Sequence, residues 1–229
     1  MRASMVFLSL VATSGYARLA AGQELPRGSP PPAARVGFQL GLRTGLAVPL
    51  GKADGAPNGE MANLFSAQVP LLVEIGGKVI PQLFVGGYLG LAFGGTAGDL
   101  QRTCVSSHAT CFAAGARLGA EAQFHILPAA RANPWIGYGI GYESVAVGFS
   151  EGSRTGSVSY NGFEFAHFMG GVDFRFSRVF GLGTFASFSI GQYRRSHYEL
   201  SGDPVIEGDI PEKAIHEWFT VGLRTVFFP

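Results

Sequence analysis

Ionisable residues recur at alternate positions within segments of the chain that are otherwise apolar or small. Seven of them could line a gated narrow channel or pair with one another: Arg43, Arg117, Glu121, Glu143, His167, Asp173 and Arg224. We favour the second role, because buried charges need partners and paired charges can fix how neighbouring strands align. Arg117 and Glu121 are four positions apart in the sequence, which places them about 13 Å apart along an extended strand. We therefore expect Arg117 and Glu121 each to pair with another strand.

Nucleophilic catalysis is not indicated by these residues. His167 is followed two positions later by Met169, where a hydroxyl nucleophile on the same strand face would stand, and the chain contains no His-x-Ser sequence. Ser196 and His197 are adjacent, and adjacent residues of a strand point to opposite faces. We therefore expect no enzymatic activity and assign no catalytic residue.

Cys104 and Cys111 are the only cysteines of the chain. In an exported protein, as inferred below, they favour a disulfide, which would contribute about 2.5 kcal/mol, mainly to its own loop. A zinc site would recruit His108 between them, but three ligands make an incomplete zinc set. The sequence therefore predicts a disulfide and no metal site.

An acidic segment lies near the end of the sequence. After Arg194, Arg195 and His197, it contains Glu199, Asp203, Glu207, Asp209, Glu212 and Glu217 against Lys213 alone. Such a segment could hold a divalent cation, or bridge through one to lipopolysaccharide phosphates. Its spacing does not match an EF-hand, so we favour a solvated loop and expect no cofactor. The formal net charge of +1 gives no indication of nucleic-acid binding.

The elements that must position these residues are strands. Apolar residues alternate with polar or small ones, as in 35–48, where Phe38 and Leu42 share one parity and Gln39 and Arg43 share the other. The pattern predicts eight strands, over 35–48, 67–75, 82–93, 112–126, 135–149, 163–176, 180–193 and 215–228. Each reaches or exceeds the roughly 9 to 11 residues that a tilted membrane-crossing strand needs.

The connections between these strands alternate in length. Long ones at 49–66, 94–111, 150–162 and 194–214 alternate with short ones at 76–81, 127–134 and 177–179, which is typical of an outer-membrane barrel. We therefore predict an all-β, eight-stranded antiparallel up-and-down transmembrane β-barrel. The uncharged stretch 79–98 could be taken for a membrane helix, but Pro81 and six glycines argue against one.

The orientation of the strands follows from the position of the charges. An Arg facing lipid near the membrane midplane costs roughly 2 to 4 kcal/mol, so the seven ionisable residues should form a polar network in the lumen. A soluble eight-stranded calyx would need the opposite arrangement, with its apolar face inside. An eight-stranded barrel has an interior just wide enough for side chains to fill.

The N-terminus has the pattern of an export signal. Arg2 precedes an apolar run and then small residues, which predicts a cleaved signal peptide over 1–22. Residues 23–34 are rich in proline and predict an extended periplasmic leader, and 35–229 form the barrel. The formal charge becomes −1 when Arg2 and Arg18 are removed. We expect the protein in the cell outer membrane.

The strand rhythm and the closing strand, HEWFTVGLRTVFFP, resemble those of the small outer-membrane barrels of the OmpA and OmpX type. In that family the last strand is the recognition signal for the barrel-assembly machinery. The resemblance places the signal on Phe219, Val221, Leu223, Phe227 and Phe228, and it implies outer-membrane lipids and lipopolysaccharide as surroundings.

The functional expectation follows from this resemblance. We expect a non-catalytic protein with a structural or surface-interaction role, acting through its extracellular loops. The first alternative is a narrow passive channel for small or hydrophobic solutes, opened by rearrangement of the lumen pairs. The second is a lipid A-modifying enzyme, since some small barrels modify lipid A. The sequence does not identify a surface partner.

Overall fold

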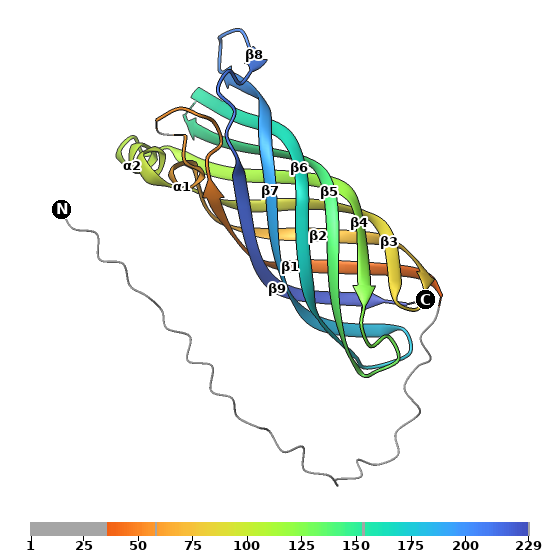
Figure 1. Ribbon diagram of the computed structural model, residues 1–229. Helices are drawn as coiled ribbons and strands as arrows, with labels where there is room; N and C mark the ends of the chain where they lie inside the picture. Colours follow the sequence, from red (N-terminus) through yellow and green to blue (C-terminus); the bar gives the residue numbers. More distant parts are fainter. Residues whose placement is uncertain (1–35, 58, 153, 229) are drawn as a thin grey trace, which may run out of the picture. The chain divides into compact units, whose positions relative to one another are not determined.

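The chain folds, in a computed structural model, into a β-barrel (Figure 1). The structure describes residues 36–57, 59–152 and 154–228. The predicted signal peptide (1–22) and periplasmic leader (23–34) lie outside the described residues and stay predictions.

Within the described residues the sheet has nine strands, and eight of them close it into a ring. They are β1 (Gly37–Gly51), β2 (Phe65–Ile80), β3 (Leu83–Thr96), β4 (Thr110–His125), β5 (Ala132–Glu151), β6 (Arg154–Arg175), β7 (Phe180–Leu200), β8 (Ile206–Asp209) and β9 (His216–Phe227). Each pairs antiparallel with its neighbours in the ring, and β9 lies between β7 and β1. The predicted eight-stranded up-and-down barrel is thereby confirmed. The short β8 adds to the free edge of β7 outside the ring.

Two of the predicted long loops are wrong in their extent. The third, 150–162, is mostly strand: β5 continues to Glu151 and β6 begins at Arg154, and these two residues pair with each other. The fourth, 194–214, contains the last residues of β7 and all of β8. At 20, 22 and 21 residues, β5, β6 and β7 are far longer than a bilayer requires and form a three-stranded ribbon at one end of the barrel. Because the long connections of an outer-membrane barrel are extracellular, we predict that this is the extracellular end and use that name for it.

The other two long loops contain short helices. α1 (Met61–Leu64) lies in the first and α2 (Gly98–Ser106) in the second, and both lie at the ribbon end (Figure 1). The ambiguous stretch 79–98 is mostly β3, as the glycines and proline indicated. Among the described residues, no helix is long and apolar enough to cross a membrane.

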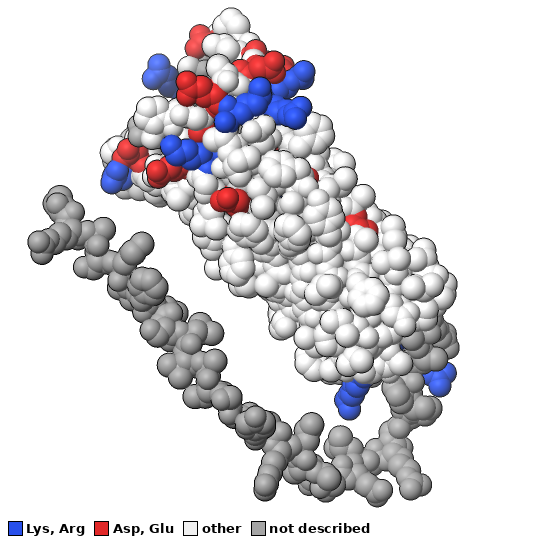
Figure 2. Space-filling model, viewed as in Figure 1, with Lys and Arg blue, Asp and Glu red and all other residues white. Residues whose placement is uncertain are grey.

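The two faces of the wall differ sharply in polarity. Outward positions of β1 such as Phe38 and Leu46 are 51% and 48% exposed, whereas inward Gln39 and Arg43 are almost completely buried. On the face shown in Figure 2, the charged side chains gather at the two ends of the barrel, and the wall between them is almost free of charge. This is the inverse of a soluble calyx, and it leaves the lumen as the place where the charges meet.

Candidate functional site

All seven ionisable residues singled out in the sequence lie on the lumen side of the wall. Six of them are buried, and Arg117 retains 18% side-chain exposure. They fall into two groups along the barrel axis, each defined by its own network of ion pairs. Each group also contains polar residues that were not among the predicted seven.

The first group, which we call the lower cluster, joins five strands. It contains Arg43, Glu74, Glu121, Gln123, Asp173 and Arg224. Arg43 contacts Glu74 at 2.5 Å and Glu121 at 2.7 Å. Arg224 contacts Glu74 at 2.8 Å and Asp173 at 2.7 Å.

Neutral groups complete the lower cluster. Gln123 donates to both Glu74 and Glu121, at 3.1 and 2.7 Å, and accepts from Arg224 at 2.6 Å. The Arg224 guanidinium also lies 4.3 Å from the ring centroid of Trp135. Carboxylates outnumber arginines here, and the Gln123 amide donates to the Glu121 Oε1 atom, whereas Arg43 contacts the other oxygen of that carboxylate.

The second group, the upper cluster, surrounds Arg117 nearer the extracellular end. Arg117 contacts Glu143 at 3.2 Å and Glu164 at 3.4 Å. Tyr193 and Trp218 donate to Glu143, at 2.5 and 2.8 Å. Tyr88, from β3, donates to Glu164 at 2.5 Å, and His216 stacks on the Tyr193 ring at 3.7 Å.

The strand alternation contains the signal for the residues that were missed. Glu74 has the inward parity of its strand between outward Val73 and Ile75, and Glu164 has the inward parity between outward Phe163 and Phe165. His167, by contrast, was predicted and lies inside, 3.7 Å from Glu164. Met169 lies two residues after His167, where a hydroxyl nucleophile would stand. Its sulfur atom accepts a hydrogen bond from the Arg43 guanidinium.

Apolar side chains from the loops cover the upper cluster. Met61, on α1, and Phe65, the first residue of β2, are buried together with Ala53 and Ile210. The Phe65 ring meets Trp218 edge-on at 6.1 Å. We call this group the loop plug, and it belongs to the same buried cluster as Tyr193 and Trp218 of the upper cluster.

The opposite end of the lumen is also occupied. The ring of Phe228 lies 5.3 Å from the Lys78 ammonium and 4.8 Å from the Arg175 guanidinium. Between the two clusters, a cavity of about 40 Å³ touches Arg43, Arg117 and His167, which is room for a few water molecules. Side chains therefore fill the described lumen almost from end to end.

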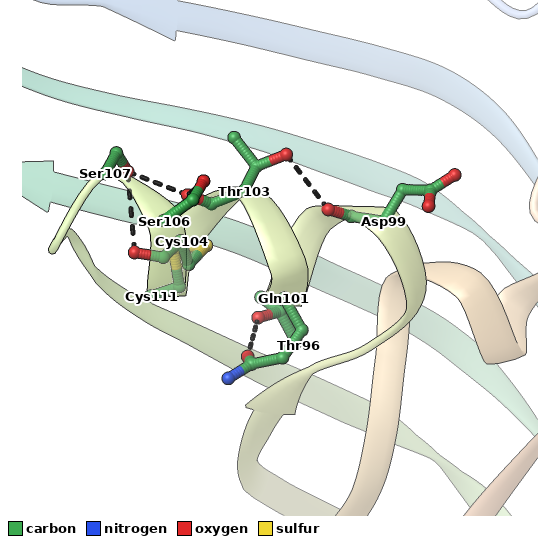
Figure 3. Close-up of a disulfide and its surroundings, with 8 residues drawn as sticks. All are labelled: Thr96, Asp99, Gln101, Thr103, Cys104, Ser106, Ser107 and Cys111. Atoms are coloured by element: carbon green, nitrogen blue, oxygen red, sulfur yellow. Dashed lines mark hydrogen bonds between the residues drawn. A yellow bond between two sulfur atoms is a disulfide. The ribbon is translucent and has the colours of Figure 1, made fainter.

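The disulfide between Cys104 and Cys111 is present and joins α2 to the start of β4 (Figure 3). The two Cα atoms lie 6.1 Å apart, and the Cys104 side chain is buried. Hydroxyl groups of Thr103 and Ser107 hydrogen-bond to backbone carbonyls within the same turn segment. The disulfide therefore attaches α2 to β4, and this short helix makes few other contacts with the barrel.

Replacing both Cys104 and Cys111 by serine is expected to release α2 and leave the barrel intact. The cross-link closes a loop of only a few residues and contributes about 2.5 kcal/mol to that loop. Amide hydrogen exchange should accelerate over 98–110, with the barrel's heat-modifiable gel mobility unchanged. Chemically reduced native protein is the matched control: it lacks the same cross-link without a substitution and should show the same acceleration. Unchanged exchange in α2 would show that the disulfide does not hold it.

The acidic segment pairs two of its carboxylates with an arginine. Glu207 and Asp209 lie on β8 and face Arg195, at 4.0 and 3.8 Å, with all three side chains exposed. Among the residues that the structure describes, no three His, Cys, Asp or Glu side chains converge as metal ligands.

The residues of the predicted assembly signal divide between two faces. Phe219, Val221, Leu223 and Phe227 point outward from β9 and are 42–53% exposed. Phe228, one position further on, turns inward to Lys78 and Arg175, as described above. Recognition of the outward row by the assembly machinery stays a prediction.

No protein-family model matches the chain, and no curated protein matches its sequence. Among solved structures, a major outer membrane protein from Thermus thermophilus is similar with a TM-score of 0.52 at 10% identity, covering 84% of this chain and 98% of that one. Neisserial surface protein A is similar with a TM-score of 0.50 at 11% identity, covering 83% and 97%.

These similarities define the class by its fold. The chain has the fold of the small outer-membrane β-barrel proteins, which confirms the resemblance drawn from its strand pattern. Within that class, this chain combines a lumen filled by ion pairs with an extended three-stranded ribbon.

Proposed function

We propose that this protein is an integral outer-membrane barrel that carries no catalytic activity and acts through its extracellular end. The membrane location is supported by the nearly uncharged outer wall and by the fold of the similar structures. Lipids and lipopolysaccharide of that membrane are then its surroundings, and the barrel-assembly machinery is its partner during insertion.

The filled lumen argues against conduction as the main role. Arg43 and Arg224 sit across the lower lumen with 2% and 0% side-chain exposure. Moving either one would leave carboxylates buried without a partner, which is strongly unfavourable. A solute would also have to pass the loop plug.

The observation that carries the interaction role is an apolar pocket at the ribbon end. It encloses about 520 Å³ between the loop helices and the ribbon. Its walls include Leu64, Leu100, Val158, Tyr198 and Ile206. Pockets of this size and polarity are typical of sites for small ligands or for an apolar anchor of a partner.

One preparation tests both parts of this proposal. Folded protein in planar bilayers should give no persistent single-channel currents. The same protein should bind the apolar fluorophore N-phenylnaphthylamine above the detergent background, and Val158→Asp should abolish that binding. Val105→Asp, at an exposed position of α2 outside the pocket, is the matched control.

The outcomes separate the alternatives. Persistent currents would favour the passive channel and contradict the sealed lumen. Equal fluorophore binding by native protein and the Val158→Asp variant would remove the pocket as the interaction site.

A further inference from the structure

A basic cleft lies on the outer wall where the ribbon leaves the barrel. It encloses about 370 Å³, and its walls include Tyr142, Phe163, Arg194, Arg195 and Lys213. Two of these are outward aromatic residues of β5 and β6, and three are cations. One carboxylate, Asp209, also lines the cleft opposite Arg195, so the charged side chains of the wall sum to a net positive charge. The cleft is separate from the lumen and from the apolar pocket.

A β-bulge places both arginines on the outside. Gly162 pairs with Tyr193 and Asn161 pairs with Arg195, so Arg194 is the extra residue of β7. Tyr193 is fully buried in the lumen, whereas both arginines are exposed. Strict alternation would have turned one of the two inward, and a bulge re-aims side chains in this way.

The cleft lies where the outer wall changes from apolar to polar. On β5, outward Ile140 and Tyr142 are followed by Ser144; on β6, Phe163 is followed outward by Asn161. Tyr142 and Phe163 pack edge to face at 5.4 Å. Aromatic residues at such a boundary lie at the level of lipid headgroups.

The cations of the cleft are available to a ligand. The Arg194 guanidinium lies 5.1 Å over the Phe163 ring, and no described carboxylate lies within ion-pair distance of Arg194 or Lys213. Arg195 faces Asp209 and Glu207 at 3.8 and 4.0 Å, distances that leave its guanidinium donors largely exposed.

We infer that this cleft binds the phosphate group of a lipid in the outer leaflet of the membrane. Guanidinium groups match phosphate oxygens with paired hydrogen bonds, and Lys213 adds a third positive charge. The acyl chains of the same lipid would lie along the apolar wall below, over Phe163 and Phe165. The position of the cleft at the edge of that wall favours a lipid over a free anion. The inference rests on the membrane location proposed above.

Native mass spectrometry of the folded protein with diphosphoryl lipid A tests this inference. Arg194→Gln/Arg195→Gln should weaken binding by about tenfold to thirtyfold, because each cation near a headgroup contributes about 1 kcal/mol. The matched control is Arg102→Gln/Arg154→Gln, which removes the same charge from the same end of the barrel but outside the cleft, and should bind like the native protein.

Three outcomes would overturn the inference. They are equal binding by the cleft variant and the native protein, an equal loss in both double variants, and undiminished binding of a lipid A analogue without phosphate. Displacement of lipid A by millimolar inorganic phosphate would identify a free-anion site instead. Heat-modifiable gel mobility shows separately whether each variant is folded, so failure of this inference is distinguishable from failure of the barrel or of its sealed lumen.

Discussion

Replacing Arg224 by leucine is expected to lower the free energy of unfolding by about 3–5 kcal/mol. The side chain has no solvent exposure and contacts Glu74 and Asp173, at 2.8 and 2.7 Å. Removing it leaves these carboxylates buried with less compensation, since Glu74 keeps only the Arg43 guanidinium and the neutral Gln123 amide as partners. The indole of Trp135 also loses its cation partner.

Urea unfolding of the protein in lipid vesicles measures this loss, with tryptophan fluorescence and gel mobility as independent probes. Arg102→Leu is the control, because Arg102 and Asp99 pair on the exposed surface of α2, where a hydrogen bond to Asp99 raises the pKa of Arg102. The control should unfold at the same urea concentration as the native protein. If Arg224→Leu did so too, the lower cluster would not stabilise the barrel.

The barrel and its inside-out polarity could be predicted because lipid and lumen impose opposite demands on alternate residues. The contrast between Phe38 and Gln39, or between Leu42 and Arg43, is visible in the sequence without any structure. The alternation of inward and outward residues also places Glu74 and Glu164 in the lumen. Each of them, however, lies one residue from an end of its predicted strand, 67–75 or 163–176. Parity is least secure there, since a turn or bulge can change it.

The ribbon could not be predicted by the same rule. Beyond the bilayer, neither face of a strand contacts lipid, so the outward row need not be apolar. On β6 the outward residues above Phe163 are Asn161, Ser159 and Ser157, which have the composition of a loop. Residues 150–162 are mostly strand because their backbone pairs with the neighbouring strands of the ribbon. Backbone pairing leaves no pattern of apolar and polar residues in the sequence.

The details of the site depend on register, which alternation leaves open. Alternation indicates that Arg117 faces the lumen, but only the pairing of β4 with β5 places it directly opposite Glu143. The outward pair of arginines in the cleft likewise depends on the bulge at Arg194. Local sequence therefore predicts which face a residue occupies, and the closed ring decides which residue it meets.

Closure of that ring leads to the second large expected effect: replacing Gly222 by alanine should prevent β9 from pairing with β1. Gly222 lies directly opposite Gly45 across this seam. A Cβ atom at Gly222 would overlap the backbone carbonyl of Thr44 and lie 2.7 Å from the Cα of Gly45. Overpacking against side chains costs about 1–3 kcal/mol, and backbone atoms of a paired strand have less freedom to move.

The measurement is the fraction of protein that shows heat-modifiable mobility after refolding into detergent. Gly77→Ala is the matched control, because a Cβ atom at Gly77 meets nothing nearer than a carbonyl oxygen at 3.5 Å. The control should fold like the native protein, whereas Gly222→Ala should lose most of the folded band. An open seam exposes backbone donors and acceptors of two strands to lipid, where no water can satisfy them. Normal folding of Gly222→Ala would mean that β1 and β9 can separate at this position without opening the barrel.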